Sequence, residues 1–397
     1  MTKNNEHKNL NVPALRFPEF SGEWKKCKVS DLLDFYSTNS LSWEQLEYDT
    51  NAMMNLHYGL IHVGLPTMVD LAKDKLPNIK EDNMPTNFEL CKEGDVAFAD
   101  ASEDTNEVAK TIEFYNLAEK NVVCGLHTIH GRDNKHKTVV GFKGYTFSST
   151  VFHNQIRRIA QGTKIYSIST KNFSECYIGL PSKPEQTKIA TLLRLIDERV
   201  ATQNKIIEDL KLLRDAISGL IFNSMKNEKT ILLGNVACIS NGSGDVQDSD
   251  SIKRDGWYPF FDRSEEQKWF PTYSFNREAI IYAGEGQNFF PRYYKGKFAL
   301  HQRCYAITDF CECLLPKYCL YFMNTLNSYF IRNAVGSTVP SLRMDMFQKA
   351  KIKIPTIERQ QEIVSTLDAL SLKCENEEIV RALYNTQKSY LLQQLFI

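Results

Sequence analysis

The sequence has no long apolar run and no excess of charge of either sign. No stretch approaches the roughly 18 consecutive apolar residues of a membrane-spanning helix, because charged residues interrupt each apolar segment. The 48 lysines and arginines balance the 48 aspartates and glutamates, so no overall field would draw the chain onto a nucleic acid or an anionic membrane. We therefore expect no membrane association, and any nucleic-acid site must be a local patch of basic residues.

Motifs that carry catalytic chemistry are missing as well. The chain contains no GxxxxGKS/T phosphate loop, no HExxH zinc helix, no GxSxG nucleophile turn, and no Asn-Pro-Pro or Asp-Pro-Pro motif of an amino-methyltransferase. The glycines at Gly242 and Gly244, and at Gly284 and Gly286, do not complete GxGxxG and indicate turns. We expect no catalytic residue in this chain and no cofactor bound to it.

Metal-binding patterns are incomplete. Cys124, His127 and His130 are three residues apart, which on a β-strand places neighbouring members on opposite faces and favours structural histidines. The cysteines at positions 311, 313 and 319 lack the paired spacing of a structural zinc site. All ten cysteines are expected to be reduced thiols, and with no secretory signal this predicts a cytoplasmic protein without a metal site.

An internal repeat organises the chain. With 42% apolar and 24% charged residues the composition is that of a globular protein, and 397 residues suffice for several domains. A shift of 174 positions places the region near 123–222 on 297–396 without a gap, which predicts two tandem copies of one unit. Matched pairs include His127 with His301, Arg158 with Arg332, Gly162 with Gly336, Pro181 with Pro355, Gln186 with Gln360, and Phe222 with Phe396.

Each copy begins with a variable region and ends with a helical one, and a proline separates the two. The variable regions contain short β-branched or aromatic runs broken by turn residues. In the first copy these are 56–63, 95–99, 121–130 and 138–142, and in the second 257–261, 279–282 and 297–307. We predict an α/β (α+β) protein with a disordered tail at 1–12, a first domain at 13–181, a first helix at 182–226, a second domain at 227–355 and a second helix at 356–397.

Both helical regions show a heptad pattern. Ser182 and Thr356 are the candidate N-caps. Burial of the two apolar stripes against each other predicts an intramolecular, antiparallel coiled coil between the domains. In the second helix Ile379, Val380 and Leu383 suggest a local phase shift around polar seam positions. The seam of the first helix contains Ile189, Leu193, Ile196, Val200, Gln203, Ile207, Leu210, Ile217 and Ile221, and that of the second contains Ile363, Leu367, Leu370, Cys374, Leu391 and Leu395.

Basic residues gather in each variable region. Phosphates are bound by lysine and arginine, and base edges are read best by arginine, lysine, asparagine and glutamine. In the second region aromatic residues lie among the basic ones, and Lys253, Arg263 and Lys268 add to the positive charge. A single such cluster is usually a solvated loop. The candidate DNA contacts are Arg132, Lys135 and Lys137 in the first region and Arg254, Arg292, Lys295 and Arg303 in the second.

The chain resembles the specificity subunits of type I restriction–modification systems over nearly its whole length. The resemblance rests on two Pro-x4-Gln-x2-Ile-x3-Leu segments, on the opening at 12–24, and on Gly94-Asp95-Val96. Each segment starts at its proline, Pro181 or Pro355, and is followed by a heptad helix. The two copies differ at Asp197, because the aligned position of the second copy is Ser371. The positions carried over to the helices as partner-binding are Gln186, Ile189, Leu193, Gln360, Ile363 and Leu367.

The resemblance implies a non-catalytic subunit that reads double-stranded DNA. Each domain would recognise half of a split site, and the unlike variable regions predict unlike half-sites. It also implies two methyltransferase subunits that hold S-adenosylmethionine and methylate adenine, and two restriction–translocase subunits that use ATP and Mg²⁺. Two alternatives remain from the residues alone: a stand-alone or fused restriction–methylation enzyme, against which the missing motifs argue, and a two-domain scaffold that does not bind DNA.

Overall fold

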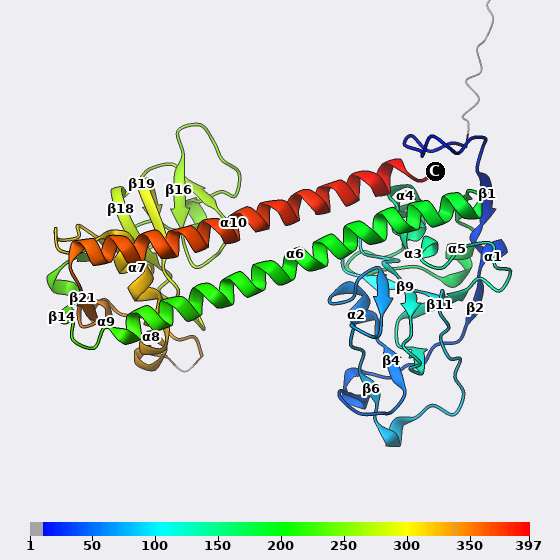
Figure 1. The fold of residues 1–397 in the computed structure, drawn as a ribbon, viewed down its shortest axis with the longest axis horizontal. Coiled ribbons are helices and arrows are strands. Elements are labelled where there is room, and N and C mark those ends of the chain that lie inside the picture. The colour runs from blue at the N-terminus through cyan, green and yellow to red at the C-terminus, as the bar shows by residue number, and fades with distance from the viewer. Residues whose placement is uncertain (1–10, 337) are drawn as a thin grey trace, which may run out of the picture. The chain divides into compact units, whose positions relative to one another are not determined.

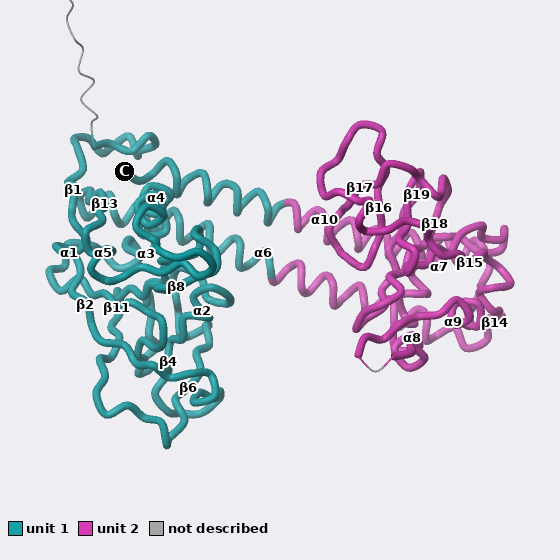
Figure 2. The backbone as a smooth tube through the Cα atoms, turned by 180° about the vertical axis from the view of Figure 1, so that it is seen from behind, with its two compact units in different colours: residues 1–204, 380–397 teal, residues 205–379 magenta. Residues whose placement is uncertain are grey.

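The computed structural model describes residues 11–336 and 338–397, so the predicted tail at 1–12 lies almost wholly outside the described residues. The chain divides into two compact units (Figure 2). Unit 1 comprises the residues up to Asn204 together with Val380–Ile397, and unit 2 comprises Lys205–Ile379. The two long helices are α6 (Lys183–Ser224) and α10 (Ile357–Gln394) (Figure 1). Each of them contributes one segment to each unit (Figure 2).

The described part of unit 1 contains two small sheets and two short strand pairs. The five-stranded sheet has the order β2-β11-β7-β9-β5, with β5 parallel to β9 and its other neighbours antiparallel. The four-stranded sheet has the order β10-β4-β6-β3, and the pairs are β1-β13 and β12-β8. The bounds are β1 (Lys25–Lys28), β2 (Asp34–Tyr36), β3 (Leu46–Glu47), β4 (Met54–Leu56), β5 (Met68–Asp70), β6 (Asn78–Ile79), β7 (Val96–Ala99), β8 (Ala101–Ser102), β9 (Thr111–Asn116), β10 (Val122–Cys124), β11 (Thr128–Arg132), β12 (Tyr166–Ser167) and β13 (Tyr177–Leu180).

Strand β7 shows why the five-stranded sheet is buried on both faces. Its side chains alternate, so Val96 and Phe98 pack among the aromatic residues of the short helices, while Ala97 and Ala99 face a second cluster that includes Leu56 of β4. A run that is apolar at every position therefore suits a central strand. The helical segments of unit 1 besides the long helices are α1 (Val29–Leu32), η1 (Trp43–Gln45), α2 (Tyr58–His62), η2 (Glu81–Asn83), α3 (Phe142–Phe147), α4 (Thr150–Ile159) and α5 (Thr170–Ser174).

Two of the expected strand-like runs in unit 1 are wrong. In the run 56–63, the strand ends at Leu56 and helix α2 follows, because Nδ1 of His57 accepts a hydrogen bond from the Gly59 N–H at 3.2 Å and caps that helix. The run 138–142 is a turn that leads into α3. There the carboxylate of Asp133 accepts a hydrogen bond from the Thr138 N–H at 2.8 Å. Both errors come from local capping that β-propensity does not describe.

Unit 2 is built on a six-stranded sheet with the order β15-β20-β18-β19-β16-β17 and one separate pair, β14-β21. Ile280 and Tyr282 of β18 face the helices, and Ala279 and Ile281 face a smaller cluster on the other side. The bounds are β14 (Lys229–Leu232), η3 (Leu233–Asn235), β15 (Cys238–Asn241), η4 (Val246–Asp248), β16 (Tyr258–Phe261), β17 (Lys268–Phe270), β18 (Phe275–Tyr282), β19 (Arg292–Leu300), β20 (Tyr305–Thr308), α7 (Pro316–Asn324), α8 (Asn327–Asn333), α9 (Met344–Gln348) and β21 (Lys351–Ile354).

The expectation that all cysteines are reduced is wrong at one pair. Cys311 and Cys313 form a disulfide in unit 2, where a tight turn brings their Cα atoms to 5.3 Å, within the range that a disulfide requires. The other eight cysteines are free.

The long helices run antiparallel to each other within each unit, as predicted. In unit 1 the start of α6 packs on the end of α10, where Ile189 and Leu193 share a core with Leu391 and Leu395. In unit 2 the end of α6 shares a core with the start of α10, and Lys211 Nζ lies 2.6 Å from Glu378 Oε1. The fold class expected from the heptads is confirmed.

The predicted phase shift in the second helix is wrong. Ile379 and Leu383 are exposed, so the seam keeps its register through polar residues instead. These residues pair across the helices: Lys388 Nζ lies 2.5 Å from Asp197 Oδ1, and Arg381 donates to Asn204 Oδ1 at 3.3 Å. A polar seam is tolerated when its groups satisfy one another.

The repeat extends to individual hydrogen bonds. Gln186 and Gln360 are buried, and each donates through Nε2 to the carbonyl of the proline five residues earlier, at 3.0 and 2.9 Å. Each also accepts, through Oε1, a backbone N–H of its own domain, from Val139 and Leu315, both at 2.9 Å. The Pro-x4-Gln motif therefore fixes the start of each long helix to its domain.

Candidate nucleic-acid interface

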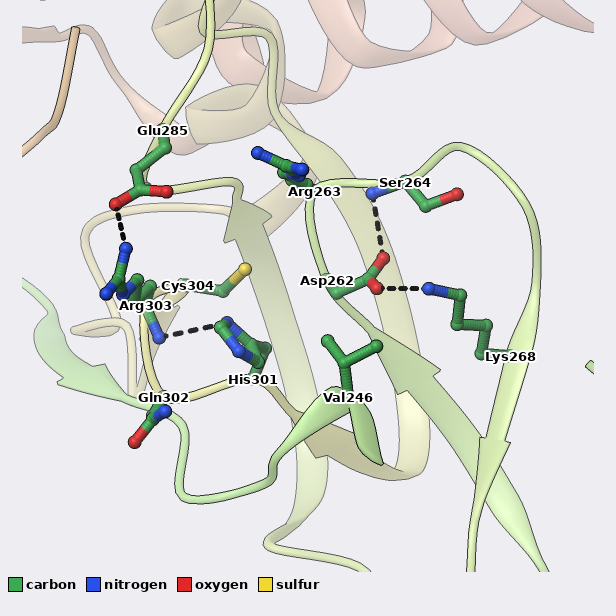
Figure 3. Close-up of a pocket in the computed structure, with 11 residues that line it drawn as sticks. Val246, Asp262, Arg263, Ser264, Lys268, Glu285, His301, Gln302, Arg303 and Cys304 are labelled. Atoms are coloured by element: carbon green, nitrogen blue, oxygen red, sulfur yellow. Dashed lines mark hydrogen bonds and ion pairs between the residues drawn. The ribbon is translucent and has the colours of Figure 1, made fainter. Parts of the chain in front are cut away.

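A concavity of unit 2 with both basic and acidic side chains lies at the loops that follow β16, β18 and β19 (Figure 3). It is a cavity of about 760 Å³. The loop after β16 supplies Asp262, Arg263 and Ser264, the loop after β18 supplies Glu285, and the loop after β19 supplies 301–304. Strand ends thus place side chains from distant parts of the sequence around one opening.

The side chains of this cavity have the chemistry of base and phosphate recognition. Arg263 and Gln302 are exposed, and Arg303 is 66% exposed in an ion pair with Glu285 at 2.6 Å. His301 Nδ1 accepts the Arg303 N–H at 3.2 Å, which orders the loop that carries the arginine. Arginine and glutamine are the side chains that pair bidentately with guanine and adenine. Of the four contacts predicted in unit 2, Arg303 lines this cavity.

Arg292 is half-buried and its guanidinium is bound to the backbone, so its predicted role as a DNA contact gains no support from its surroundings. Its guanidinium donates to the carbonyls of Ser264, at 2.9 Å, and Asp262, and it lies over the ring of Phe261. Burial lowers the pKa of this guanidinium. Arg292 supports the loop after β16 and thereby the wall of the cavity, and this is a positioning role.

The other predicted contacts of unit 2 are at the surface. Lys295 is 73% exposed on β19, with its ammonium 4.0 Å from Glu278. Arg254 is 61% exposed, pairs with Asp250 at 2.6 Å and lies 4.9 Å from the centre of the Trp257 ring. Neither residue lines the cavity of Arg303, so the structure does not bring the four predicted residues of this unit into one cluster.

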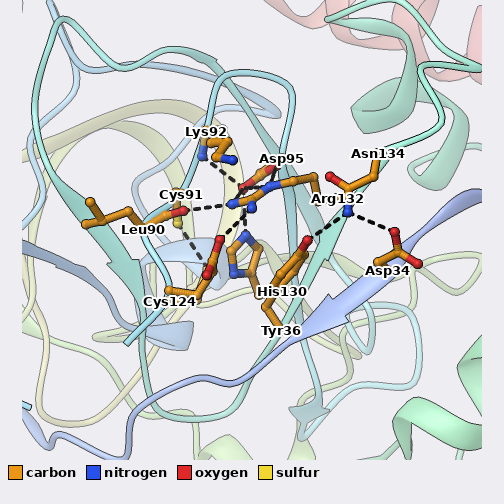
Figure 4. Close-up of polar contacts among 11 residues, drawn as sticks. Asp34, Tyr36, Leu90, Cys91, Lys92, Asp95, Cys124, His130, Arg132 and Asn134 are labelled. Atoms are coloured by element: carbon orange, nitrogen blue, oxygen red, sulfur yellow. Dashed lines mark hydrogen bonds and ion pairs between the residues drawn. The ribbon is translucent and has the colours of Figure 1, made fainter. Parts of the chain in front are cut away.

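Arg132 of unit 1 is buried, and this corrects its assignment as a DNA contact. Its guanidinium forms ion pairs with Asp95, at 2.8 Å, and with Glu89, at 2.5 Å (Figure 4). Burial alone would lower the pKa of the Arg132 guanidinium, but the hydrogen bonds to Asp95 and Glu89 outweigh this effect. The pKa therefore lies above its usual value, and the residue stays charged. Burial raises the pKa of Asp95, but hydrogen bonds from His130 and Arg132 lower it below its usual value. Arg132 is a structural residue of the sheet.

Lys135 and Lys137 follow β11 on a polar loop. Both ammonium groups donate to the backbone carbonyl of Asp31, at 3.1 and 2.9 Å, and both line a cavity of about 830 Å³ together with Lys25 and Lys26. Lys135 is exposed and Lys137 is half-buried. This basic surface suits phosphate rather than base edges, because lysine acts as a point charge.

The six residues predicted to bind partners are buried, which corrects that assignment. Their exposed fractions are 2% or less, and each packs or hydrogen-bonds inside its own unit. Ile189 and Leu193 belong to the core of unit 1, and Ile363 and Leu367 to that of unit 2. Gln186 and Gln360 make the backbone hydrogen bonds described above. A buried side chain offers a partner no surface, so these residues position the helices.

The sequence analysis did not select Gln302 and Glu285 as candidates. The other residues that line their cavity are far away in the sequence, so no local pattern connects them. The available signal was the repeat, which pairs His127 with His301 next to the cavity. In unit 1 His127 is half exposed, with Nδ1 3.1 Å from Asp100 Oδ1.

No helix within the described ranges is long and apolar enough to span a membrane.

Two segments of the chain, residues 74–212 and 225–382, match the family described as Type I restriction modification DNA specificity domain. The matches cover well over half of the sequence, and the chain therefore belongs to this family. The Type I restriction enzyme EcoDI specificity subunit of Escherichia coli is 32% identical over 149 residues, which are 37% of this chain and 32% of that relative. The match thus spans about a third of the relative's length.

Two solved structures share the fold. The S subunit of the type I restriction-modification system from M. genitalium has a TM-score of 0.59 at 16% identity, over 97% of this chain and 99% of that chain. A chain from a study of complex assembly and conformational transition of the type I R–M system has a TM-score of 0.58 at 15% identity, over 93% and 96% of the two chains.

Proposed function

We propose that this chain is the non-catalytic specificity subunit of a type I restriction–modification complex and reads an asymmetric, bipartite site on double-stranded DNA. One observation carries the proposal: a repeated scaffold bears two different sheets. The glutamine contacts of Gln186 and Gln360 are the same in both units, but one unit has five- and four-stranded sheets and the other a six-stranded sheet. A shared scaffold with unlike reading surfaces predicts two unlike half-sites.

The DNA contacts divide into base-reading and phosphate-binding groups. In unit 2, Arg263, Gln302 and Arg303 surround the cavity and are proposed to reach base edges, while Lys295 and Arg254 bind phosphates. In unit 1, Lys135 and Lys137 bind phosphates. Such contacts give a binding constant that falls steeply with salt even though the net charge of the chain is zero.

Two methyltransferase subunits and two restriction–translocase subunits are the proposed partners. They would supply S-adenosylmethionine for adenine methylation, and ATP and Mg²⁺ for restriction, in the cytoplasm. An exposed stripe on α6 supports a protein partner: Ile206, Leu213 and Leu220 recur every seven residues and are 39%, 47% and 73% exposed. A heptad spacing keeps such residues on one face of a helix.

Two measurements of DNA methylation test the proposal, one with the purified chain and one in a host cell. The purified chain, incubated with DNA and labelled S-adenosylmethionine, should transfer no methyl group until methyltransferase subunits are added. Methylome sequencing of a host that carries this chain with its methyltransferase should then reveal one split, asymmetric adenine motif. Transfer by the isolated chain, or a methylome that does not depend on the chain, would overturn the proposal.

A further inference from the structure

Three potential metal ligands meet in the interior of unit 1. Cys91 precedes β7, Cys124 ends β10, and His130 lies in the middle of β11. The Sγ atoms of the two cysteines are 3.6 Å apart, and a ring nitrogen of His130 lies within 4.8 Å of both. The exposed fractions of the three residues are 6%, 2% and 0% (Figure 4).

The distances match tetrahedral coordination better than a disulfide. Two thiolates on one zinc ion, each about 2.3 Å from the metal, lie about 3.8 Å apart. A disulfide requires about 2.05 Å. The pairing of strands places the ligands: the Cys91 N–H donates to the Val122 carbonyl at 2.8 Å, which holds the loop before β7 against β10.

One ring nitrogen of His130 is hydrogen-bonded, and the other has no partner among the described residues. Nε2 lies 2.8 Å from Asp95 Oδ2, whereas Nδ1 is buried and has no hydrogen-bond partner within the described part of the chain. An unpaired buried nitrogen is costly. In Figure 4 the ring lies between Asp95 and Cys124. A carboxylate on the far nitrogen is the arrangement that orients metal-binding histidines.

The charges around the cluster select a divalent ion. Asp95 and Arg132 form a buried ion pair at 2.8 Å and so balance each other. A divalent cation bound to two thiolates and a neutral imidazole adds no net charge, since it replaces the two thiol protons. A monovalent ion would leave a buried negative charge. Thiolate and imidazole ligands are those that zinc prefers.

We propose that Cys91, Cys124 and His130 bind a structural Zn²⁺ ion in unit 1, with Asp95 holding the imidazole. The three protein ligands leave a fourth position for a ligand from outside the protein. The ion ties the loop before β7 to β10 and β11, so it stabilises the recognition domain rather than acting in chemistry. The site belongs to the first repeat, because the second has Phe298 and Cys304 at the positions of Cys124 and His130. It replaces the sequence-based expectation that this chain holds no metal.

The first measurement uses the full-length chain, purified under reducing conditions. Elemental analysis after dialysis against metal-free buffer should find about one zinc per chain. Exchange with Co²⁺ should give thiolate-to-cobalt charge-transfer bands and the intense d–d absorption of a tetrahedral site. A folded, reduced chain that holds no zinc and shows no such cobalt spectrum would overturn the proposal, as would a Cys91–Cys124 disulfide in that material.

The second measurement compares cysteine variants. Cys91→Ser and Cys124→Ser should each lose the zinc and the cobalt spectrum, whereas Cys319→Ser, a change at a fully buried cysteine of unit 2, should keep both. If the first two variants do not fold, chelation of the unaltered chain replaces them, and it should lower the melting temperature of unit 1. Zinc that survives the loss of Cys91 and Cys124 would contradict the assignment.

Discussion

Two buried glutamines determine how each long helix meets its domain. A glutamine side chain can donate two hydrogen bonds and accept two, so one residue can satisfy several backbone groups at once. Gln360 uses this capacity on the carbonyls of Pro355 and Cys313 and on the N–H of Leu315. An apolar side chain of the same size would leave those groups unpaired in the interior.

Replacement of this glutamine should therefore open the helix start. Gln360→Ala is expected to lower the free energy of local unfolding by about 1–3 kcal/mol, because it leaves buried backbone groups without partners. Hydrogen exchange at the Leu315 N–H, followed by mass spectrometry, measures this directly. Gln361→Ala, at the exposed neighbouring position, is the control and should change little. Equal exchange in the two variants would contradict the bonding described.

Arg303 is the residue on which base reading can be tested. Arg303→Ala in the assembled complex is expected to cost about 1–3 kcal/mol of discrimination at one base pair of the second half-site. Competition binding with single-base variants of the DNA measures the loss. Arg359→Ala removes a similarly exposed arginine that also pairs with a glutamate, at 2.8 Å, and should leave discrimination intact. A loss that is the same for all sequences would indicate a phosphate contact instead.

The roles of single residues were the hardest feature to predict from the sequence. Arg132 and Arg292 look like free surface cations from the sequence. Only the fold shows that Asp95 holds the buried Arg132 and that the carbonyl of Asp262 binds the half-buried Arg292. Cys91 stands 33 positions before Cys124, so no spacing rule joins them. Burial and pairing depend on strand neighbours that local patterns do not contain.

At the scale of elements, heptads were readable because helix contacts are local. The repeat predicted the antiparallel pairing of the helices. It did not predict the polar seam, because Lys388 and Asp197 are unfavourable in a helix–helix contact unless they lie opposite each other. Short strands were harder, and the run at 56–63 became a helix through a cap at His57.

The long helices should set the spacing between half-sites. One heptad adds about 10 Å to a helix, or about three base pairs of DNA at 3.4 Å each. The pair Arg381 and Asn204 marks facing positions, so matched insertions there keep the seams aligned. The expected methylation motif has a spacer longer by about three base pairs and unchanged half-sites. Altered half-sites with an unchanged spacer would contradict this role for the helices.

The exposed stripe on α6 should contribute to partner binding. Leu213→Ser combined with Leu220→Ser is expected to weaken association with the methyltransferase subunit at least tenfold, while the far-ultraviolet circular dichroism stays the same, because both side chains are exposed. Ile252→Ser removes an apolar side chain that is 71% exposed on a loop and serves as the control. Equal affinity of the double variant and the unaltered chain in calorimetry would exclude this face.

At the scale of the whole molecule, the two-copy organisation was accessible from sequence because a gapless shift preserves it. The different sheets of the two copies were not accessible, since the variable regions share little pattern. In unit 2, Lys229 of β14 pairs with Ile354 of β21, so the domain begins and ends on adjacent strands. A segment with adjoining ends can be replaced with little effect on the scaffold.

Exchange of residues 229–354 for the matching region of a relative should therefore change one half of the methylated motif and preserve the other half. Gln360 contacts the backbone carbonyl of Cys313 and the backbone N–H of Leu315, which lie in this segment. The replacement segment keeps both contacts if the residue at position 315 is not proline. Genomic methylation sequencing reports the motif. If both halves change together, the domains do not read independently.

The segment before β1 is hydrogen-bonded to the last turn of α10. The Leu15 N–H donates to the Gln394 carbonyl at 3.0 Å, so the last turn of α10 returns to the place where unit 1 begins. The path from β1 through α6, unit 2 and α10 thus closes into a loop of backbone. In a closed loop the starting point is arbitrary: a gene that begins at the second repeat and joins Gln394 to Leu15 would encode the same contacts in rotated order. The fold depends on which elements are neighbours and not on which is translated first.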